Sequence, residues 1–218
     1  MSPMPHEQAR GHGGGGAFIA FEGGDGAGKS TQIDALAASL SEKGREVLLT
    51  REPGGTPVGS AIRQVVLHGE HVDARAEALL FAADRAHHVA TVVRPALERG
   101  VVVLTDRYMD SSVAYQGAAR GADPQEIADL SAWATRGLLP DLTVLLDLDP
   151  QVGYQRRRGQ HDRLESESEA FHLQVRSAFC DLAAAAPQRY LLLDAATDVA
   201  DLQRAIADRV AALLDLRQ

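Results

Sequence analysis

The sequence is poor in cysteine and in positive charge, and each shortage excludes a class of protein or site. Its only cysteine is Cys180, which excludes an internal disulfide bond and any metal site built from several cysteines. We expect a reducing compartment, the cytoplasm, for such a chain. The formal net charge is −8, whereas a general nucleic-acid-binding surface is normally basic. We therefore expect no nucleic-acid partner, and positive charge that binds phosphate has to be local.

Long apolar runs are also missing. No stretch of about 18 consecutive apolar residues occurs, so the sequence predicts no membrane-spanning helix and no membrane partner. Residues 1–16 are polar, end in four glycines and lack the apolar stretch of a secretory signal, and we expect them to form a disordered tail. With 45% hydrophobic residues in the chain, residues 17–218 can form one substantial core, which predicts a single domain.

Lysine occurs only at positions 29 and 43, and Lys29 belongs to the segment GGDGAGKS at 23–30. This segment follows the apolar run AFIAF and precedes a helical pattern, as in a phosphate-binding P-loop. Glycines let backbone N–H groups turn inward around a phosphate, the lysine reaches the β- and γ-phosphates, and the Ser30 hydroxyl can bind Mg²⁺. The alternative, a glycine-rich turn that happens to precede Lys-Ser, fits this context poorly. The predicted phosphate site comprises Gly23, Gly24, Asp25, Gly26, Ala27, Gly28, Lys29, Ser30 and Thr31.

Short apolar segments alternate with helical patterns along the chain. Buried parallel strands are apolar throughout, and helices connect them. The sequence therefore predicts an α/β fold with a five-stranded parallel sheet covered by helices on both faces. The predicted strands are 17–21, 46–50, 101–104, 142–147 and 190–193. Helical patterns run near 30–43, 57–67, 73–98, 111–119, 124–138, 150–158, 165–185 and 198–216.

Charged residues follow these strands, at the edge of the sheet where ligands of α/β proteins bind. Arg51 and Glu52 follow the second strand, and Asp106 and Arg107 follow the third. Arg51 and Arg107 form a second phosphate-binding centre outside the P-loop, and Asp106 is suited to hold Mg²⁺. A helix cap remains the alternative for Asp106, and a surface ion pair remains the alternative for Arg107.

Three consecutive arginines, 156–158, follow the fourth strand. They could close over the phosphates and neutralise the charge that develops on a transferred group. A solvated helix face explains them equally well.

Together these segments resemble the thymidylate kinase family. The resemblance covers about residues 17–214 and implies a P-loop, nucleoside monophosphate kinase-like fold with a short lid at about 150–165. It also implies transfer of the γ-phosphoryl group of ATP to dTMP, giving dTDP, with Mg²⁺ and usually in a homodimer. The motifs that carry it are FEG at 21–23, DGAGKST at 25–31, REPGGT at 51–56, DRY at 106–108, SSVAYQG at 111–117, PDLT at 140–143 and the pattern over 171–195.

The resemblance implies roles around the acceptor nucleotide. Phe81 would stack on the thymine ring, Arg85 would hydrogen-bond the base, and Tyr115 would disfavour a 2′-hydroxyl. Helix core is the alternative for Phe81, surface charge for Arg85, and an ordinary or exposed helix face for the other helical positions. The implied dTMP site comprises Arg51, Glu52, Arg63, Phe81, Arg85, Arg107, Ser112, Tyr115 and Gln116.

Members of the family differ in where their catalytic arginines lie. Some carry an arginine inside the P-loop, where this chain has Asp25, whose alternative role is turn formation. We therefore expect the lid-arginine type, with arginines from 156–158 and Arg163, and a lid that excludes water when it closes. The implied catalytic residues are Lys29, Asp25, Arg107, Arg156 and Arg158, and none of them is a nucleophile.

Other functions fit less well. A regulatory GTPase would need an Asn-Lys-x-Asp stretch, which is missing, and a non-enzymatic nucleotide-binding subunit would not need the second arginine centre. The nearest alternative is a kinase of another nucleoside monophosphate or of a deoxynucleoside. His87 and His88 are adjacent on a predicted helix, so we expect both to face solvent rather than to bind a metal. Trp133 is either core or a subunit contact.

Overall fold

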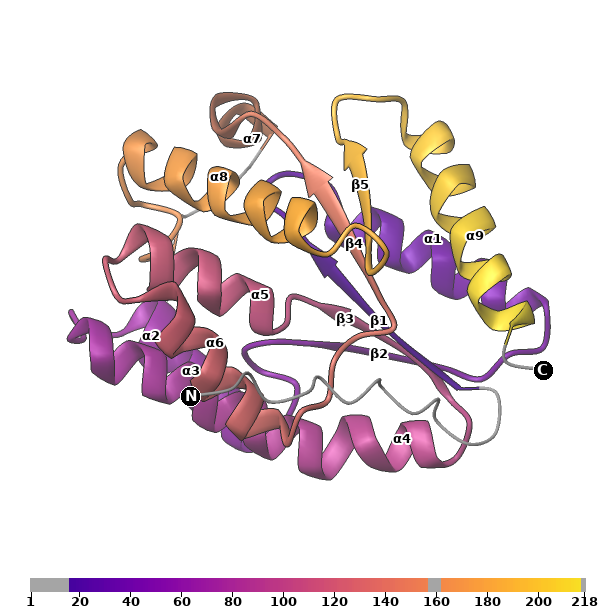
Figure 1. Ribbon diagram of the computed structural model, residues 1–218, viewed down its shortest axis with the longest axis horizontal. Coiled ribbons are helices and arrows are strands. Elements are labelled where there is room, and N and C mark those ends of the chain that lie inside the picture. The colour runs from indigo at the N-terminus through magenta and orange to yellow at the C-terminus, as the bar shows by residue number, and fades with distance from the viewer. Residues whose placement is uncertain (1–15, 157–161, 217–218) are drawn as a thin grey trace.

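The computed structural model of the chain describes residues 16–156 and 162–216. Its strands form one parallel sheet in the order β2-β3-β1-β4-β5 (Figure 1). The predicted α/β class and five-stranded parallel sheet are confirmed. Of the tail expected at 1–16 all but Gly16 lies outside the described residues, and so do Arg157 and Arg158. The strands are β1 (Ala17–Glu22), β2 (Val47–Arg51), β3 (Val102–Asp106), β4 (Leu142–Asp147) and β5 (Tyr190–Asp194).

The helices begin and end close to the predicted limits. Side chains at several N-termini accept a backbone N–H, as Thr56 does from Gly59 and Ser168 from Phe171, which stabilises the first turn. Proline stands at the start of α2, where its missing N–H costs nothing. The helices are α1 (Lys29–Glu42), α2 (Pro57–His68), α3 (Ala74–His88), α4 (Arg94–Glu98), α5 (Met109–Ser112), α6 (Pro124–Thr135), α7 (Pro150–Arg156), α8 (Glu169–Ala185) and α9 (Val199–Asp215). The π-helical segments are η1 (Val89–Val93), which joins α3 to α4, and η2 (Val113–Ala119), which follows α5.

Helices cover both faces of the sheet because successive strand side chains point to opposite faces. Ile19 and Leu104 pack with α1 and α9 on one face. Phe18 and Val103 pack with η1 and α4 on the other, where Leu145 contacts the aromatic side of α8. Figure 1 shows α1 and α9 together on one side of the strands and α8 on the opposite side. Burying both faces explains why the strands are apolar throughout.

The carboxyl ends of the central strands lie at one level. Asp106 pairs with Phe21 of β1 and with Arg51 of β2, so the residues that follow these strands are neighbours. The chain leaves β1 through Gly23, whose φ is 132°. A Cβ atom there would lie 2.3 Å from the carbonyl oxygen of Leu146, so only glycine fits. The P-loop therefore begins directly at the carboxyl end of β1.

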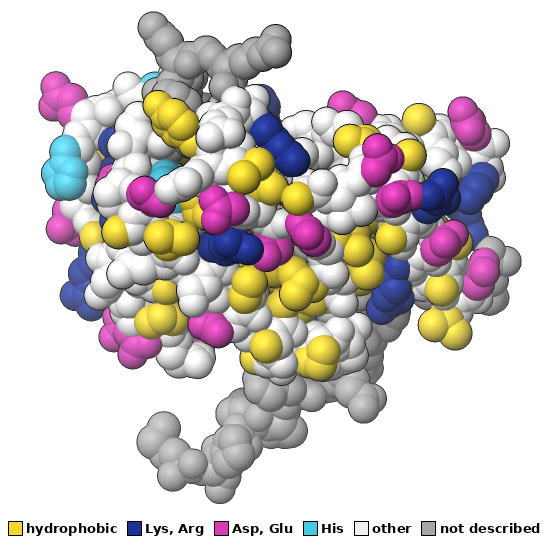
Figure 2. Space-filling view, turned by 90° about the horizontal axis from the view of Figure 1, so that it is seen from above, with side chains coloured by type: hydrophobic (Ala, Val, Ile, Leu, Met, Phe, Trp, Pro, Cys, Tyr) yellow, Lys and Arg dark blue, Asp and Glu magenta, His cyan; other side chains and the backbone are white. Residues whose placement is uncertain are grey.

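The surface is mixed in charge. On the face seen in Figure 2, acidic and basic side chains are interspersed and apolar side chains lie between them. Within residues 16–156 and 162–216, no helix combines the length and the apolar character needed to cross a bilayer.

Candidate active site

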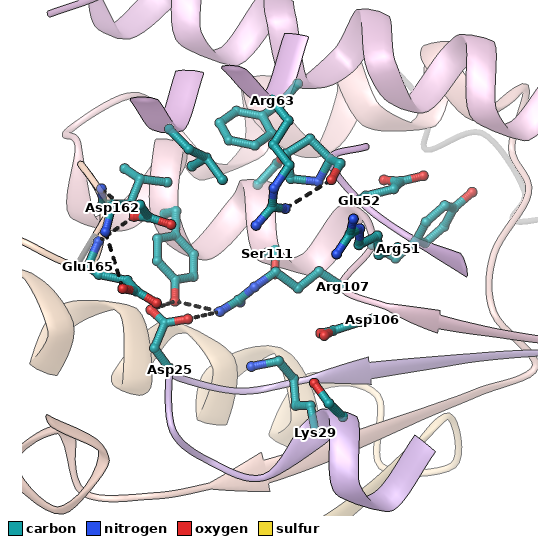
Figure 3. A pocket seen from close by; sticks show the side chains of 18 of the residues that line it. Asp25, Lys29, Arg51, Glu52, Arg63, Asp106, Arg107, Ser111, Asp162 and Glu165 are labelled. Atoms are coloured by element: carbon teal, nitrogen blue, oxygen red, sulfur yellow. Dashed lines mark hydrogen bonds and ion pairs between the residues drawn. The ribbon is translucent and has the colours of Figure 1, made fainter. Parts of the chain in front are cut away.

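A cavity of about 480 Å³ lies at the carboxyl ends of the strands, between the P-loop and the helices α2, α3 and η2 (Figure 3). It brings together most of the predicted site residues. Gly23, Gly24 and Ala27 belong to the same loop without lining the cavity, and Arg158 lies outside the described residues. The predicted residues that line it are Asp25, Gly26, Gly28, Lys29, Ser30, Thr31, Arg51, Glu52, Arg63, Phe81, Arg85, Asp106, Arg107, Ser112, Tyr115, Gln116 and Arg156.

Lys29 is the first residue of α1, and its ammonium group is held by the P-loop itself. Its Nζ donates to the carbonyl oxygens of Gly23 at 3.1 Å and Gly24 at 3.0 Å. Burial and the nearby Arg107 lower the pKa of Lys29. An anion at the N-terminus of α1 would relieve that repulsion and would meet the positive end of the helix dipole. The lysine is thus placed for a phosphate.

Arg107 connects the P-loop to the helical side of the cavity. Its Nη2 donates to Asp25 Oδ1 at 2.6 Å and its Nη1 donates to Ser111 Oγ at 3.1 Å. The guanidinium also stacks on Tyr115, 5.1 Å from the ring centre. Burial alone would lower the pKa of Arg107, but Tyr115, Asp25, Asp106 and Glu22 together outweigh it and raise that pKa well above its ordinary value. Arg107 therefore remains a cation, and its side chain is only 18% exposed, so the surface-pair alternative is wrong.

Glu22, at the end of β1, supports the segment that carries Arg107. Its Oε1 accepts from the backbone N–H of Tyr108 at 2.8 Å and of Ser111 at 3.2 Å, and its Oε2 accepts from Ser111 Oγ at 2.6 Å. Burial, followed by repulsion from Asp110, raises the pKa of Glu22 to about 7. Glu22 and Ser111 belong to motifs of the family resemblance but were not among the predicted site residues, because their partners lie far away along the chain.

Asp106 has the features of a cation ligand. Its Oδ1 is buried and makes no hydrogen bond with any part of the chain that the structure describes. Buried polar atoms almost always have partners, so this oxygen is suited to a ligand. Figure 3 shows Asp106 beside Lys29 at the floor of the cavity, which Ser30 also lines. Among the described residues no group of three or more His, Cys, Asp or Glu side chains is arranged to hold a metal ion.

Phe81 and Arg85 extend the cavity along α3. Phe81 is 7% exposed and packs in one apolar cluster with Leu164 and Tyr115, so it is core and cavity wall at once. Arg85 is buried, so the surface-charge alternative for it is wrong. Its Nε donates to Glu52 at 2.7 Å, and its other N–H groups donate to Ser112 Oγ, Ser131 Oγ and the carbonyl oxygen of Tyr108.

The expectation that His88 faces solvent is wrong. His88 is fully buried, with Nδ1 2.8 Å from Glu52 Oε1 and Nε2 2.6 Å from Thr50 Oγ1. Arg85 and His88 are three residues apart, so both lie on the face of α3 that packs over the end of β2. His87 is partly buried. Neighbouring Asp84 is also buried, and burial, followed by repulsion from Glu52, raises its pKa to about 6.

The loop before α8 closes the cavity with residues that the sequence did not single out. Asp162, Leu164 and Glu165 line it. Figure 3 shows Asp162 and Glu165 at this side of the cavity. Arg163, expected among the lid arginines, instead donates to Glu77 on α3 and to the carbonyl oxygen of Val66 at 2.9 Å. Arg156 lines the cavity and donates to the carbonyl oxygen of Ala195 at 3.0 Å. In the sequence, only the charged residues that follow the arginines at 156–158 could have indicated that this loop lines the cavity.

Known proteins with similar sequences agree on one family. The sequence model of a protein family described as thymidylate kinase matches residues 21–206. The thymidylate kinase of Clavibacter michiganensis subsp. michiganensis is 58% identical over 203 residues, 91% of this chain and 96% of the relative. That of Deinococcus radiodurans is 53% identical over 194 residues, 88% and 94% of the two chains. That of Cutibacterium acnes is 52% identical over 203 residues, 92% and 99% of the two chains.

These matches span the P-loop, the second arginine centre and the loop before α8, which are the parts that meet in the cavity. The chain belongs to the thymidylate kinase family, whose members are phosphotransferases that convert dTMP to dTDP with ATP and Mg²⁺.

Proposed function

We propose that this chain transfers the γ-phosphoryl group of ATP to dTMP in the cavity above the sheet. ATP lies on the P-loop and dTMP lies between Phe81 and Gln116, so that the two phosphates meet at Arg107. The observation that carries this proposal is the position of Arg107, whose guanidinium contacts Asp25 of the P-loop and Tyr115 of η2 in one cavity.

Phosphoryl transfer requires alignment and neutralisation of charge more than covalent chemistry. Lys29 binds the β- and γ-phosphates, and Ser30 and Asp106 would hold Mg²⁺, which would supply positive charge to neutralise the phosphates. Arg107 binds the acceptor phosphate and stabilises the negative charge on the phosphoryl group during its transfer between the nucleotides. Asp25 orients Arg107 through the ion pair already described.

Arg51 and Arg63 complete the acceptor phosphate site. Burial and the positive charge of Arg51 lower the pKa of Arg63, and a phosphate between these guanidinium groups would remove that repulsion. Arg63 Nη1 donates to the carbonyl oxygen of Pro53 at 3.0 Å, which directs its guanidinium into the cavity (Figure 3). Glu52, which follows Arg51 in the chain, accepts a hydrogen bond from Arg85 Nε and so holds Arg85 in place.

The base lies on Phe81, with Arg85, Ser112 and Gln116 at its edge and Tyr115 beside the sugar. All of these residues line the helical half of the cavity. An aromatic face with polar groups at the rim is suited to a pyrimidine.

Catalytic arginines come from the lid at about 150–165, with Arg156 and Arg158 as the candidates. Asp25 stands at the P-loop position where an arginine would otherwise serve, and Arg156 already lines the cavity. Arg163 is not part of this set, since its guanidinium contacts Glu77. Residues 17–218 act as a single domain, in a homodimer, in the cytoplasm.

Acceptor specificity tests the proposal. A coupled assay with Mg²⁺ and ATP against dTMP, dUMP, dCMP, AMP and thymidine should give the highest kcat/KM with dTMP and a lower value with dUMP. Nucleotide hydrolysis that is not stimulated by dTMP would contradict the proposal and favour a GTPase-like or ATPase-like function.

A further inference from the structure

Glu77 is a fully buried carboxylate on α3, outside the cavity lining, and none of the steps above uses it. Its Oε1 accepts a hydrogen bond from Gln116 Nε2 at 2.9 Å. Its Oε2 accepts from Arg163, and the Nε of Arg120 lies 3.5 Å from Oε1. One buried carboxylate thus connects a side chain that lines the acceptor cavity with two guanidinium groups.

The carboxylate determines which way the amide of Gln116 faces. A carboxylate between guanidinium groups only accepts hydrogen bonds, so Gln116 has to turn its NH₂ group toward Glu77. The opposite orientation would place two acceptors 2.9 Å apart. Gln116 is 2% exposed and lines the cavity, and with its NH₂ group turned to Glu77 its carbonyl oxygen is the acceptor that remains for a ligand.

Ser112 lies one helical turn away and has the complementary polarity. Its Oγ accepts from Arg85 Nη1 at 3.2 Å and from Arg85 Nη2 at 3.1 Å. A hydroxyl oxygen has two lone pairs, so with both in use the remaining capacity of Ser112 is to donate its proton. The cavity therefore offers an acceptor at Gln116 and a donor at Ser112.

We propose, resting on the dTMP site described above, that Glu77 is a positioning residue that fixes Gln116 as an acceptor and so selects the pyrimidine. Thymine and uracil carry an N–H at N3 beside a carbonyl at C4, which matches an acceptor and a donor. Cytosine has the reverse pattern, an acceptor at N3 beside an amino group at C4. A site built to hydrogen-bond one pattern rejects the other strongly, because its own buried groups lose their partners.

The contacts around Glu77 keep the carboxylate from moving. Arg163 also binds the end of α2, through its Nε to Val66 and its backbone N–H to Leu67. Arg120 is paired in turn with Glu167 at 2.8 Å. Because Arg163 is anchored on α2, the carboxylate of Glu77 stays within reach of Gln116 even without the pair between Arg120 and Glu167. Gln116 cannot turn over without breaking its bond to Glu77.

The test compares kcat/KM for dTMP and dCMP in wild type, Glu77→Gln and Gln116→Met. A glutamine at 77 can offer either its oxygen or its NH₂ group, so Gln116 is free to turn. We expect the dTMP to dCMP ratio to fall about tenfold or more in Glu77→Gln, with the loss for dTMP in KM rather than kcat. Gln116→Met should lower the ratio similarly, and the double variant should lower it no further than Gln116→Met alone.

Glu167→Gln is the matched control, since it removes a partner of Arg120 without touching Gln116, and it should keep the wild-type ratio. Melting temperatures separate destabilisation from loss of discrimination. If Glu77→Gln does not fold, Gln116→Met decides, and a wild-type ratio in either folded variant overturns the inference. Wild-type protein that does not use dTMP would overturn the proposed function as well.

Discussion

Arg107 adopts a left-handed backbone conformation, with φ 70°, which turns its side chain back across the P-loop. Its guanidinium contacts Asp25, Ser111 and Tyr115, so it contributes to both halves of the site. In the proposed mechanism Arg107 binds the acceptor phosphate and also stabilises the charge of the transition state.

Arg107→Ala should lower kcat with dTMP by about 10²- to 10³-fold, because a buried cation that stabilises developing charge is lost. ATP affinity should change by less than about threefold, since Lys29 and the loop N–H groups remain. Steady-state kinetics and ATP titration measure the two effects. Arg99→Ala, at an exposed helix end, is the control, and near-normal turnover in Arg107→Ala would refute the assignment.

Asp84 should make stability depend on pH. Its folded-state pKa of about 6 lies above the ordinary value of 3.8, so protonation favours the folded state. The stability that it contributes is complete below pH 3.8 and is lost as the pH rises through about 6. Asp84→Asn carries no charge to bury, so its stability relative to wild type should increase by roughly 1 to 3 kcal/mol between pH 4 and 7. Urea unfolding at several pH values measures this, and a constant difference would count against it.

The backbone of α7 lies against the P-loop. A Cβ atom on Gly153 would lie 2.4 Å from the carbonyl oxygen of Asp25, and one on Gly26 would lie 2.4 Å from the carbonyl oxygen of Gly153. The last residue of α7, Arg156, lines the cavity, so the close approach determines how far this arginine reaches.

Gly153→Ala should push α7 away from the P-loop. We expect the KM for ATP to rise by roughly three- to tenfold and kcat to fall, because displacing a positioned group weakens catalysis even when the fold survives. Kinetics with varied ATP test this, together with the melting temperature. Val152→Ala, on the partly exposed side of the same helix, should behave as wild type, and normal kinetics in Gly153→Ala would show that α7 tolerates the shift.

The sequence predicts a helix over 111–119, and the structure confirms it. The part from Val113 to Ala119 is π-helical. The wider turn of η2 carries Tyr115 and Gln116, which both line the cavity. Such turns are frequent at functional sites. Local sequence periodicity does not distinguish them from α-helix, because the difference arises from packing against α6 and α8.

At the scale of the whole molecule, the adjacent helices α2, α3 and α6 each carry an exposed large apolar side chain. Trp133 is 79% exposed, Leu79 is 58% exposed and Val65 is 47% exposed. Burying an aromatic side chain of this size between subunits would stabilise a dimer. Because Trp133 is so exposed, the alternative that it belongs to the core is wrong. That it forms a subunit contact remains a prediction.

Sedimentation at micromolar concentration should give twice the chain mass. Trp133→Glu should shift the protein to the monomer, because a charge would be buried in the interface. Leu173→Glu, at a partly exposed position on α8, is the control and should remain dimeric. A monomeric wild type would exclude the proposed homodimer.

The strands, the P-loop and the charged residues at the strand ends, such as Arg51 and Asp106, could all be predicted. Each depends on the local sequence pattern and on the fact that parallel strands end at the same edge of the sheet. The sequence alone therefore determined the fold class and the cavity edge, and its motifs carried the resemblance to the family. The burial of His88, the support of Arg107 by Glu22 and the pairing of Arg163 with Glu77 required the tertiary structure. Their partners lie tens of residues away, and only packing decides which of many charged side chains meet and lose contact with water.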